Sequence, residues 1–257
     1  MNRFRIATYN IHKGRGLDGR VRVERIARVL EEVHADIVAV QEVVSREGPS
    51  IEDHQASYLA NQFGYHYAIG ETRKHRGGIY GNVTLSRWDF ELVRHVDLSV
   101  PRREERGVLR TDIRIGSHLF HVFNVHLGTS HRERRTQAVR LIDETLLCAV
   151  DISGPRVVLG DFNEWTHGLV SRTLKSEFHL TDLRNHIPRT RAYPAVLPLL
   201  NLDHIYLDHH LKIEHAFFQR NRLALVASDH LPLVAEVALR EPHRLQEVNS
   251  AAERDSG

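Results

Sequence analysis

The sequence has little cysteine and no long apolar run, and each shortage excludes a class of protein. Its 257 residues contain one cysteine, Cys148, so no disulfide can form within the chain. We expect Cys148 to be a small buried residue of a helix, and we expect a reducing, cytoplasmic compartment. No apolar stretch approaches the roughly 20 residues that span a bilayer. Residues 1–10 also lack the basic segment and apolar run of a signal peptide.

Neither sign of charge dominates, because 35 Lys and Arg residues face 33 Asp and Glu residues. The chain is therefore not a polycation that binds nucleic acid with its whole surface. Of the 35 basic residues, 31 are Arg, whose planar fork suits phosphate, although compositional bias produces the same excess. Arg clusters at 73–76, 102–110 and 131–135 are solvated faces unless they lie beside a site. Aromatic residues are sparse in these clusters, which weakens a prediction of single-strand binding.

Short apolar runs bounded by Gly, Ser and Pro predict many strands and few helices. Strands are expected at 4–9, 37–40, 66–69, 82–86, 108–115, 118–126, 157–161, 202–207, 225–227 and 233–239, and helices at 21–34, 57–63, 133–150 and 169–174. Strand and helix do not alternate regularly, so we expect one mixed α/β sandwich domain over residues 1–240. The polar segment 241–257 has no hydrophobic period and is expected to be a disordered tail.

Polar side chains stand at the ends of the expected inner strands. The pairs are Asn10 with His12, Gln41 with Glu42, Asn124 with His126, Asp161 with Asn163, Asp203 with His204, and Asp229 with His230. Each alone has a plain alternative, such as a turn amide, a surface acid or a buried histidine. Their recurrence favours a site, because a strand end spares a polar group the burial penalty and keeps it rigid. Carboxylate and amide oxygens suit Mg²⁺, histidines can move protons or contact phosphate, and no Cys/His spacing indicates structural zinc.

These residues resemble the endonuclease/exonuclease/phosphatase superfamily, which has the deoxyribonuclease I-like fold. The matching segments are TYNIH at 8–12, VQEV at 40–43, YGNVTLSR at 80–87, NVHL at 124–127, LGDFN at 159–163, LDHI at 202–205 and SDHLP at 228–232. They follow the family order and span residues 4–239, which makes the set far more specific than any single segment. The resemblance implies a four-layered α/β sandwich of two facing mixed or antiparallel sheets flanked by helices, with the site at one edge.

The resemblance also implies a metal site and a proton carrier. Glu42 would be the main Mg²⁺ ligand, helped by Asn10 and Asp229, and Mn²⁺ would substitute. His230 would be the general base, oriented by Asp203.

Further roles follow for the phosphate and the water. Asp161 would position the attacking water, Asn163 would hold a phosphate oxygen, and His126 would bind phosphate or assist the leaving group. Either Asp161 or His230 serves as the base in such enzymes, and we predict His230.

Four more residues are candidates for substrate binding, namely His12, Arg106, Asn82 and Asn124. His12 stands where some family members carry an acid near the metal. With Lys13 it makes that rim basic, which suits either an extra substrate phosphate or an ordinary surface.

The predicted function is Mg²⁺-dependent hydrolysis of a phosphodiester, by a nuclease that acts on DNA or RNA. The alternative is a phosphatase or phosphodiesterase for a phospholipid or a sugar phosphate of the inositol type. The apolar segment 193–200 is relevant to the phospholipid alternative. Such a segment is a packed loop when it is buried, and when it is exposed it can contact acyl chains or a nucleobase. A third alternative is a non-catalytic binding module. Nucleic acid is the expected partner, a membrane lipid is not favoured, and no obligate protein partner is predicted.

Overall fold

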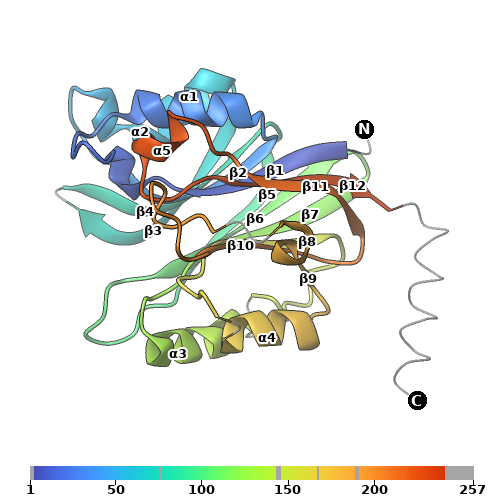
Figure 1. The fold of residues 1–257 in the computed structure, drawn as a ribbon. Coiled ribbons are helices and arrows are strands. Elements are labelled where there is room, and N and C mark those ends of the chain that lie inside the picture. The colour runs from blue at the N-terminus through green and yellow to red at the C-terminus, as the bar shows by residue number, and fades with distance from the viewer. Residues whose placement is uncertain (1–2, 76, 143–145, 167, 189–190, 241–257) are drawn as a thin grey trace, which may run out of the picture.

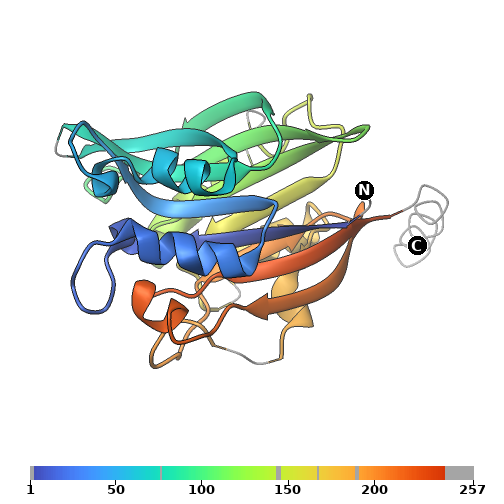
Figure 2. The same cartoon turned by 90° about the horizontal axis from the view of Figure 1, so that it is seen from above.

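Two six-stranded β-sheets pack face to face, and helices cover their outer faces (Figures 1 and 2). The computed structural model describes residues 3–75, 77–142, 146–166, 168–188 and 191–240. The predicted tail at 241–257 lies outside these residues. Among the described residues, no helix has both the length and the apolar character needed to cross a membrane.

The first sheet has the strand order β11-β12-β1-β2-β4-β3. Its strands are β1 (Arg3–Asn10), β2 (Ile37–Ser45), β3 (His66–His75), β4 (Gly78–Ser86), β11 (Leu211–Phe218) and β12 (Leu233–Leu239). Within it β1 and β2 are parallel, and the other neighbours are antiparallel. Helices α1 (Val23–Val33), α2 (Gln55–Phe63) and α5 (Ala224–Ala227) lie on its outer face (Figure 1).

The second sheet repeats this plan in the order β5-β6-β7-β8-β10-β9. Its strands are β5 (Phe90–Asp97), β6 (Gly107–Ile115), β7 (His118–His126), β8 (Arg156–Asp161), β9 (Thr181–Asp182) and β10 (Asp203–Leu207). The parallel pair here is β7 and β8. Helices α3 (His131–Leu141) and α4 (Leu169–Ser176) cover its outer face, so the four-layered α/β sandwich expected from the sequence is confirmed.

Apolar side chains from the two inner sheet faces form a shared core. The rings of Phe4 and Phe120, one from each sheet, meet edge to face with centroids 5.0 Å apart, a favoured aromatic geometry. A second cluster, which includes Phe162, Leu141 and Leu174, fills the layer between the second sheet and helices α3 and α4. The sheets thus form a rigid support for the loops at their edges.

Two expected elements differ from the structure. Residues 225–227, expected to be a strand, belong to the short helix α5, where the Asn221 side chain accepts from the Ala224 N–H. A short apolar run does not distinguish helix from strand, and the position beside β1 is taken by β12.

The helix expected at 133–150 ends at Leu141. Residues 143–145 lie outside the described part, and Cys148 is exposed in a turn segment rather than buried in a helix.

Three strands were not expected from the sequence, namely β5, β9 and β11. β5 and β11 are edge strands with alternating or largely exposed side chains, so they lack the buried apolar run that reveals an inner strand. β9 has only two residues.

Candidate active site

The predicted polar residues meet at one edge because of strand direction. The parallel strands β1 and β2 end at the same edge, as do the parallel strands β7 and β8. Strand β10 runs antiparallel to β8, so its first residue, Asp203, lies opposite Asp161. Strand β12 begins beside the end of β1, which places the loop with His230 at this edge. Strand direction and register, which no local sequence pattern specifies, therefore bring distant parts of the chain together at one edge.

Asp161 lies at the centre of this group and is buried. Its Oδ2 accepts a hydrogen bond from Asn10 Nδ2 at 3.0 Å. The same oxygen lies 3.6 Å from His126 Nε2 and 3.8 Å from His230 Nε2. Its Oδ1 accepts from the Asn163 backbone N–H at 2.8 Å. One carboxylate is thus surrounded by four of the residues predicted from the sequence.

Gly160 allows β8 to deliver Asp161 to this position. It has φ 144°, and a Cβ there would lie 1.9 Å from the Val125 carbonyl oxygen. Only glycine tolerates both the close approach of β7 and this backbone conformation.

His230 is paired with Asp203, as predicted. Its Nδ1 lies 2.7 Å from Asp203 Oδ2, and both side chains are buried. The Tyr193 ring packs on the imidazole at a centroid distance of 4.6 Å, which the sequence did not predict. Burial lowers the pKa of His230, but the charges of Asp203 and Asp161, the Asp203 hydrogen bond and the charge of Asp229 outweigh it and raise the pKa to about 10. In the free protein His230 is therefore an imidazolium at neutral pH.

Glu42 stands in a β-bulge of β2 with φ 60°. A left-handed backbone at a residue other than glycine is strained and is typical of functional sites. Its carboxylate accepts from Asn10 Nδ2 at 3.3 Å and from Lys13 Nζ at 2.8 Å. From the sequence, Lys13 was a basic rim residue; only the fold places it against Glu42.

The Glu42 carboxylate is ionised across the physiological range. Burial raises its pKa, but His126, Lys13 and the hydrogen bonds from Lys13 and Asn10 outweigh burial and lower the pKa to about 2. Burial and the charge of Arg106 lower the pKa of His126 to about 4, so His126 is neutral at neutral pH. Lys13 and Asn10 are then the groups that stabilise the Glu42 charge.

Arg106 is close enough to this site to influence the pKa of His126, but it is held by the protein itself. Its Nε donates to the Leu127 carbonyl at 3.1 Å and its Nη2 to Glu104 at 2.9 Å, and the side chain is buried. Arg106 therefore contributes positive charge to the site, but its guanidinium is already bonded within the protein and is not free to bind a substrate phosphate.

Asn82 and Asn124 lie inside the sandwich instead of at the site surface. Asn82 Nδ2 donates to the carbonyls of Gly107 and Asn124, both at 3.1 Å. Asn124 Nδ2 donates to the carbonyls of Val40 and Val83, and its Oδ1 accepts from Gln41. These bonds join the two sheets beneath the site and use the donors of both amides, so neither is available to donate to a substrate.

Asn163 and the exposed Trp165 follow β8 at the rim. Asn163 has φ 49° and donates from Nδ2 to the Leu127 carbonyl at 2.9 Å. The Trp165 side chain is 52% exposed, and the Arg134 guanidinium lies 5.6 Å from its ring. The sequence did not predict a role for Trp165; the available signal was a large aromatic residue two positions after Asn163, whereas its exposure is known only from the structure.

His12 and Asp229 form the opposite rim. His12 Nδ1 lies 3.5 Å from Asp229 Oδ1, and both side chains are partly exposed. The His12 N–H donates to Asn10 Oδ1 at 3.0 Å. Ser228 Oγ donates to the Asn10 carbonyl at 2.8 Å, so the rim is tied to the end of β1.

The oxygen donors at this edge fit a hard divalent cation. Oxygens of Glu42 and Asp161 both accept from Asn10 Nδ2, so two carboxylates converge here, and carboxylate oxygens suit Mg²⁺. The Lys13 ammonium group already pairs with the Glu42 carboxylate, so this carboxylate can be reached by a positively charged group.

One other group of potential ligands lies elsewhere. Among the described residues, Asp208, His209 and His210 bring their ligand atoms within 4.8 Å of one another. They follow the end of β10 that is opposite Asp203, so this group is separate from the site.

Known proteins share both the sequence pattern and the fold. A family model described as the Endonuclease/Exonuclease/phosphatase family matches residues 7–230. The Escherichia coli protein YbhP, itself uncharacterized, is 31% identical over 251 residues, which cover 92% of this chain and 96% of YbhP. A solved endonuclease/exonuclease/phosphatase from Beutenbergia cavernae has a TM-score of 0.75 at 22% identity, over 93% of this chain and 72% of that one. The mannosyl-6-phosphatase Bt3783 of Bacteroides thetaiotaomicron has a TM-score of 0.73 at 17% identity, over 92% and 100%.

The two solved structures establish the shared fold, whereas the family match and the YbhP identity establish relationship in sequence. The chain therefore belongs to the endonuclease/exonuclease/phosphatase family of phosphoric ester hydrolases.

Proposed function

We propose that the protein is a Mg²⁺-dependent phosphodiesterase that cleaves nucleic acid. The observation that supports it most is the position of Asp161 Oδ2, within 4 Å of side-chain nitrogens of Asn10, His126 and His230. Hydrolysis of a phosphodiester requires neutralised phosphate oxygens and a water placed in line with the leaving oxygen. The nitrogens of Asn10, His126 and His230 can contact phosphate oxygens, and the Asp161 carboxylate between them can accept a hydrogen bond from the attacking water.

Glu42, Asn10 and Asp229 would hold the cation. When bound, Mg²⁺ supplies positive charge that offsets the charge of the phosphate. Glu42 is suited to the role because its carboxylate remains ionised, with a pKa lowered to about 2.

The remaining residues position phosphate and protons. His126, neutral at neutral pH, and Asn163 would hydrogen-bond phosphate oxygens or the leaving group. Asp161 and His230 would handle the proton of the water, with Asp203 holding the imidazole in place at 2.7 Å. In the free protein His230 already carries its proton, so Asp161 is the acceptor unless His230 first releases that proton to solvent. The prediction that His230 is the base stays open, and the two assignments give different pH profiles.

Exposed arginines favour a polyanionic substrate. Arg102 and Arg103 lie in the loop before β6, whose first residue, Gly107, pairs with His126 at the site edge. Arg132 and Arg135 are exposed on α3, which begins five residues after His126. Trp165 adds a surface on which a base can stack.

Arg110, in contrast, gives no support to nucleic-acid binding. It is fully buried and bonded to Asp112 and Asp151, so its role is structural.

A substrate panel tests this proposal. Plasmid, single-stranded DNA, RNA and bis(p-nitrophenyl) phosphate would be incubated with Mg²⁺, Mn²⁺ or EDTA. We expect metal-dependent cleavage of a polynucleotide that weakens as salt rises, and a further loss in an Arg132→Gln/Arg135→Gln variant that spares bis(p-nitrophenyl) phosphate. Hydrolysis of the small ester without any polynucleotide cleavage would overturn the nuclease assignment.

A second candidate substrate is a phospholipid, because three apolar side chains of the segment 193–200 are exposed. Val196, Leu197 and Leu199 are 57%, 66% and 52% exposed, and the Ala195 N–H donates to the Asp229 carbonyl at 2.8 Å. An apolar surface is thus attached to the site rim. Release of headgroup phosphate from anionic liposomes, lost in a Leu197→Ser variant, would favour this candidate over the nuclease.

A further inference from the structure

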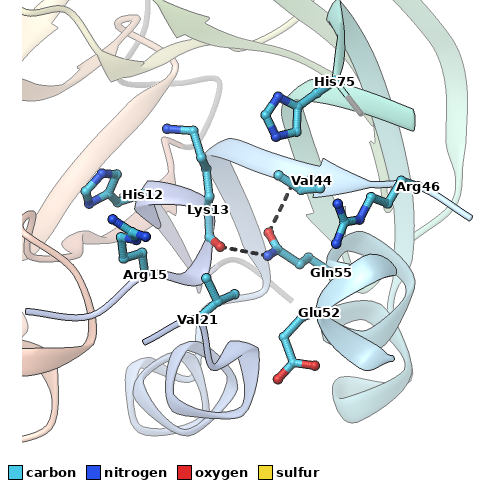
Figure 3. Close-up of a pocket in the computed structure, with 9 residues that line it drawn as sticks. All are labelled: His12, Lys13, Arg15, Val21, Val44, Arg46, Glu52, Gln55 and His75. Atoms are coloured by element: carbon cyan, nitrogen blue, oxygen red, sulfur yellow. Dashed lines mark hydrogen bonds between the residues drawn. The ribbon is translucent and has the colours of Figure 1, made fainter. Parts of the chain in front are cut away.

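Figure 3 shows the residues around a cavity of about 300 Å³, which Lys13 links to the active site because it also bonds Glu42. The cavity lies between the turn η1 (His12–Gly14), the end of β2, the start of α2 and the end of β3. Its size falls at the lower end of the range for small-molecule pockets, about 300–1,000 Å³. The lining residues are His12, Lys13, Arg15, Val21, Val44, Arg46, Glu52, Gln55 and His75.

Positive charge predominates in this lining. Lys13, Arg15 and Arg46 are fixed cations, and Glu52 is the one carboxylate among the lining residues. Figure 3 shows His12 and Arg15 on one side and Arg46 on the other, with the Glu52 carboxylate turned away from the other labelled side chains. An anion would therefore meet cations from two sides.

In the part of the chain that the structure describes, two of the three cations are bonded to carboxylates of the protein, and Arg15 is the one that remains for a ligand. Lys13 Nζ bonds Glu42 at 2.8 Å, and Arg46 Nε bonds Asp53 at 2.5 Å. Within the described part of the chain, the Arg15 side chain has no ion pair. Arg15 is exposed and lines the cavity, and an unpaired Arg fork in a basic cavity is the group expected to bind an incoming phosphate.

The two histidines of the lining have contacts of their own. His12 lies 3.5 Å from Asp229, and the His75 ring packs against Tyr80 at a centroid distance of 6.3 Å.

The wall that carries these residues is held rigidly. His12, Lys13 and Gly14 have φ values of 46°, 61° and 70°, a left-handed turn that costs energy at residues other than glycine. Buried Gln55 fixes the turn, because its Nε2 donates to the Lys13 carbonyl at 2.8 Å and its Oε1 accepts from the Val44 N–H at 3.0 Å. Both bonds are drawn in Figure 3. A preorganised turn binds a ligand without the cost of ordering it.

We infer that this cavity binds a second phosphate group of the substrate while the ester to be cleaved lies at Glu42. The inference rests on the proposed function, and Lys13 connects the two places because it lines the cavity and bonds Glu42. The second phosphate is either the next phosphodiester of a nucleic acid strand or a phosphomonoester on a small substrate. Substrates with two phosphates are then preferred over matched substrates with one.

Matched substrates and a matched variant test this inference. The thymidine dinucleotide TpT carries one phosphate, TpTpT adds an internal phosphodiester, and pTpT and TpTp add a terminal phosphate. We expect Arg15→Gln to reduce the preference for two phosphates, measured as a ratio of kcat/KM values, about tenfold, and Arg15→Lys to restore part of it. Arg20→Gln is the control, because Arg20 is exposed on the same loop but does not line the cavity. No preference in the wild-type protein, or an equal loss with one and two phosphates, would overturn the inference.

The substrate arms also identify the source of the second phosphate. Preference for TpTpT points to the next phosphodiester of a strand, and preference for pTpT or TpTp points to a phosphomonoester.

A binding experiment separates this inference from the proposed function. Inorganic phosphate would be titrated into the protein in EDTA by calorimetry. We expect binding by the wild type and by Arg20→Gln, weakened about tenfold in Arg15→Gln. If no ester is cleaved but this pattern holds, the proposed function fails and the phosphate cavity stands; equal binding by all three proteins rejects the cavity.

Discussion

Replacing Asp203 by Asn removes the charge that supports His230 and leaves the side chain nearly the same size. Burial opposes the imidazolium, yet Asp203, Asp161 and Asp229 together raise the pKa of His230 from 6.5 to about 10. A rise of this size corresponds to a net stabilisation of the imidazolium of about 5 kcal/mol. Asp203 is the largest of the three contributors. We therefore expect Asp203→Asn to lower the pKa of His230 and to remove about 2 kcal/mol of this stabilisation.

Stability follows the same linkage. A pKa raised on folding contributes stability that is fully present below the unfolded value of about 6.5 and is lost as the pH rises toward 10. The unfolding free energies of the wild type and Asp203→Asn should thus differ most near pH 6 and converge toward pH 10. Urea unfolding in EDTA measures this, and nitrogen-15 NMR of the imidazole measures the pKa directly.

Activity should fall as well, by about 10²- to 10⁴-fold, the range typical of lost acid–base catalysis. If His230 is the base, the rate rises with pH through its pKa; if it acts as the protonated partner, the rate declines above that pKa.

Asp208→Asn is the matched control. Asp208 pairs with His210 at 3.0 Å beyond the opposite end of the same strand. A wild-type rate and pH profile in Asp203→Asn, or an equal loss of activity in Asp208→Asn, would refute the reasoning.

Three further predictions concern the metal, a buried ion pair and a glycine. Glu42→Gln should weaken Mg²⁺ binding, measured by calorimetry, and reduce hydrolysis of bis(p-nitrophenyl) phosphate at least about 10²-fold. EDTA should abolish wild-type hydrolysis until Mg²⁺ is restored, and hydrolysis that resists EDTA would contradict both expectations. Asp112→Asn should lower the free energy of unfolding by about 2–3 kcal/mol at pH 7, because buried Arg110 loses one of its two carboxylate partners and keeps only Asp151. Burial raises the pKa of Asp112, but its bonds to His121 and Arg110 outweigh burial and lower it, so this difference should shrink as the pH falls below about 4 in urea unfolding. Gly160→Ala should lower the free energy of unfolding by about 3 kcal/mol or more, because the new Cβ would clash with Val125 and the backbone would be strained. Gly116 is the control: it has φ 62° and no neighbour within 4 Å, so Gly116→Ala should lower the free energy of unfolding by about 1 kcal/mol in the same assay.

The sequence by itself determined the family and the set of residues at the strand ends. Buried strands show themselves as apolar runs, and a polar residue that ends such a run is visible without knowledge of its partners. Asn10, Glu42 and Asp161 were found in this way, whereas the apolar run before His230 belongs to the helix α5 and Asp203 opens β10. The order of the segments then identified the fold, including the pairing of Asp203 with His230.

Only the tertiary structure decided which polar residues face a ligand and which hold the protein together. Asn82, Asn124 and Arg110 are buried with partners from distant strands, although in sequence they look like site residues. Lys13 meets Glu42 because a left-handed turn and a β-bulge, 29 residues apart, come together. Exposure and pairing depend on neighbours far along the chain, so the local pattern cannot fix them, and those neighbours also form the cavity beside the site.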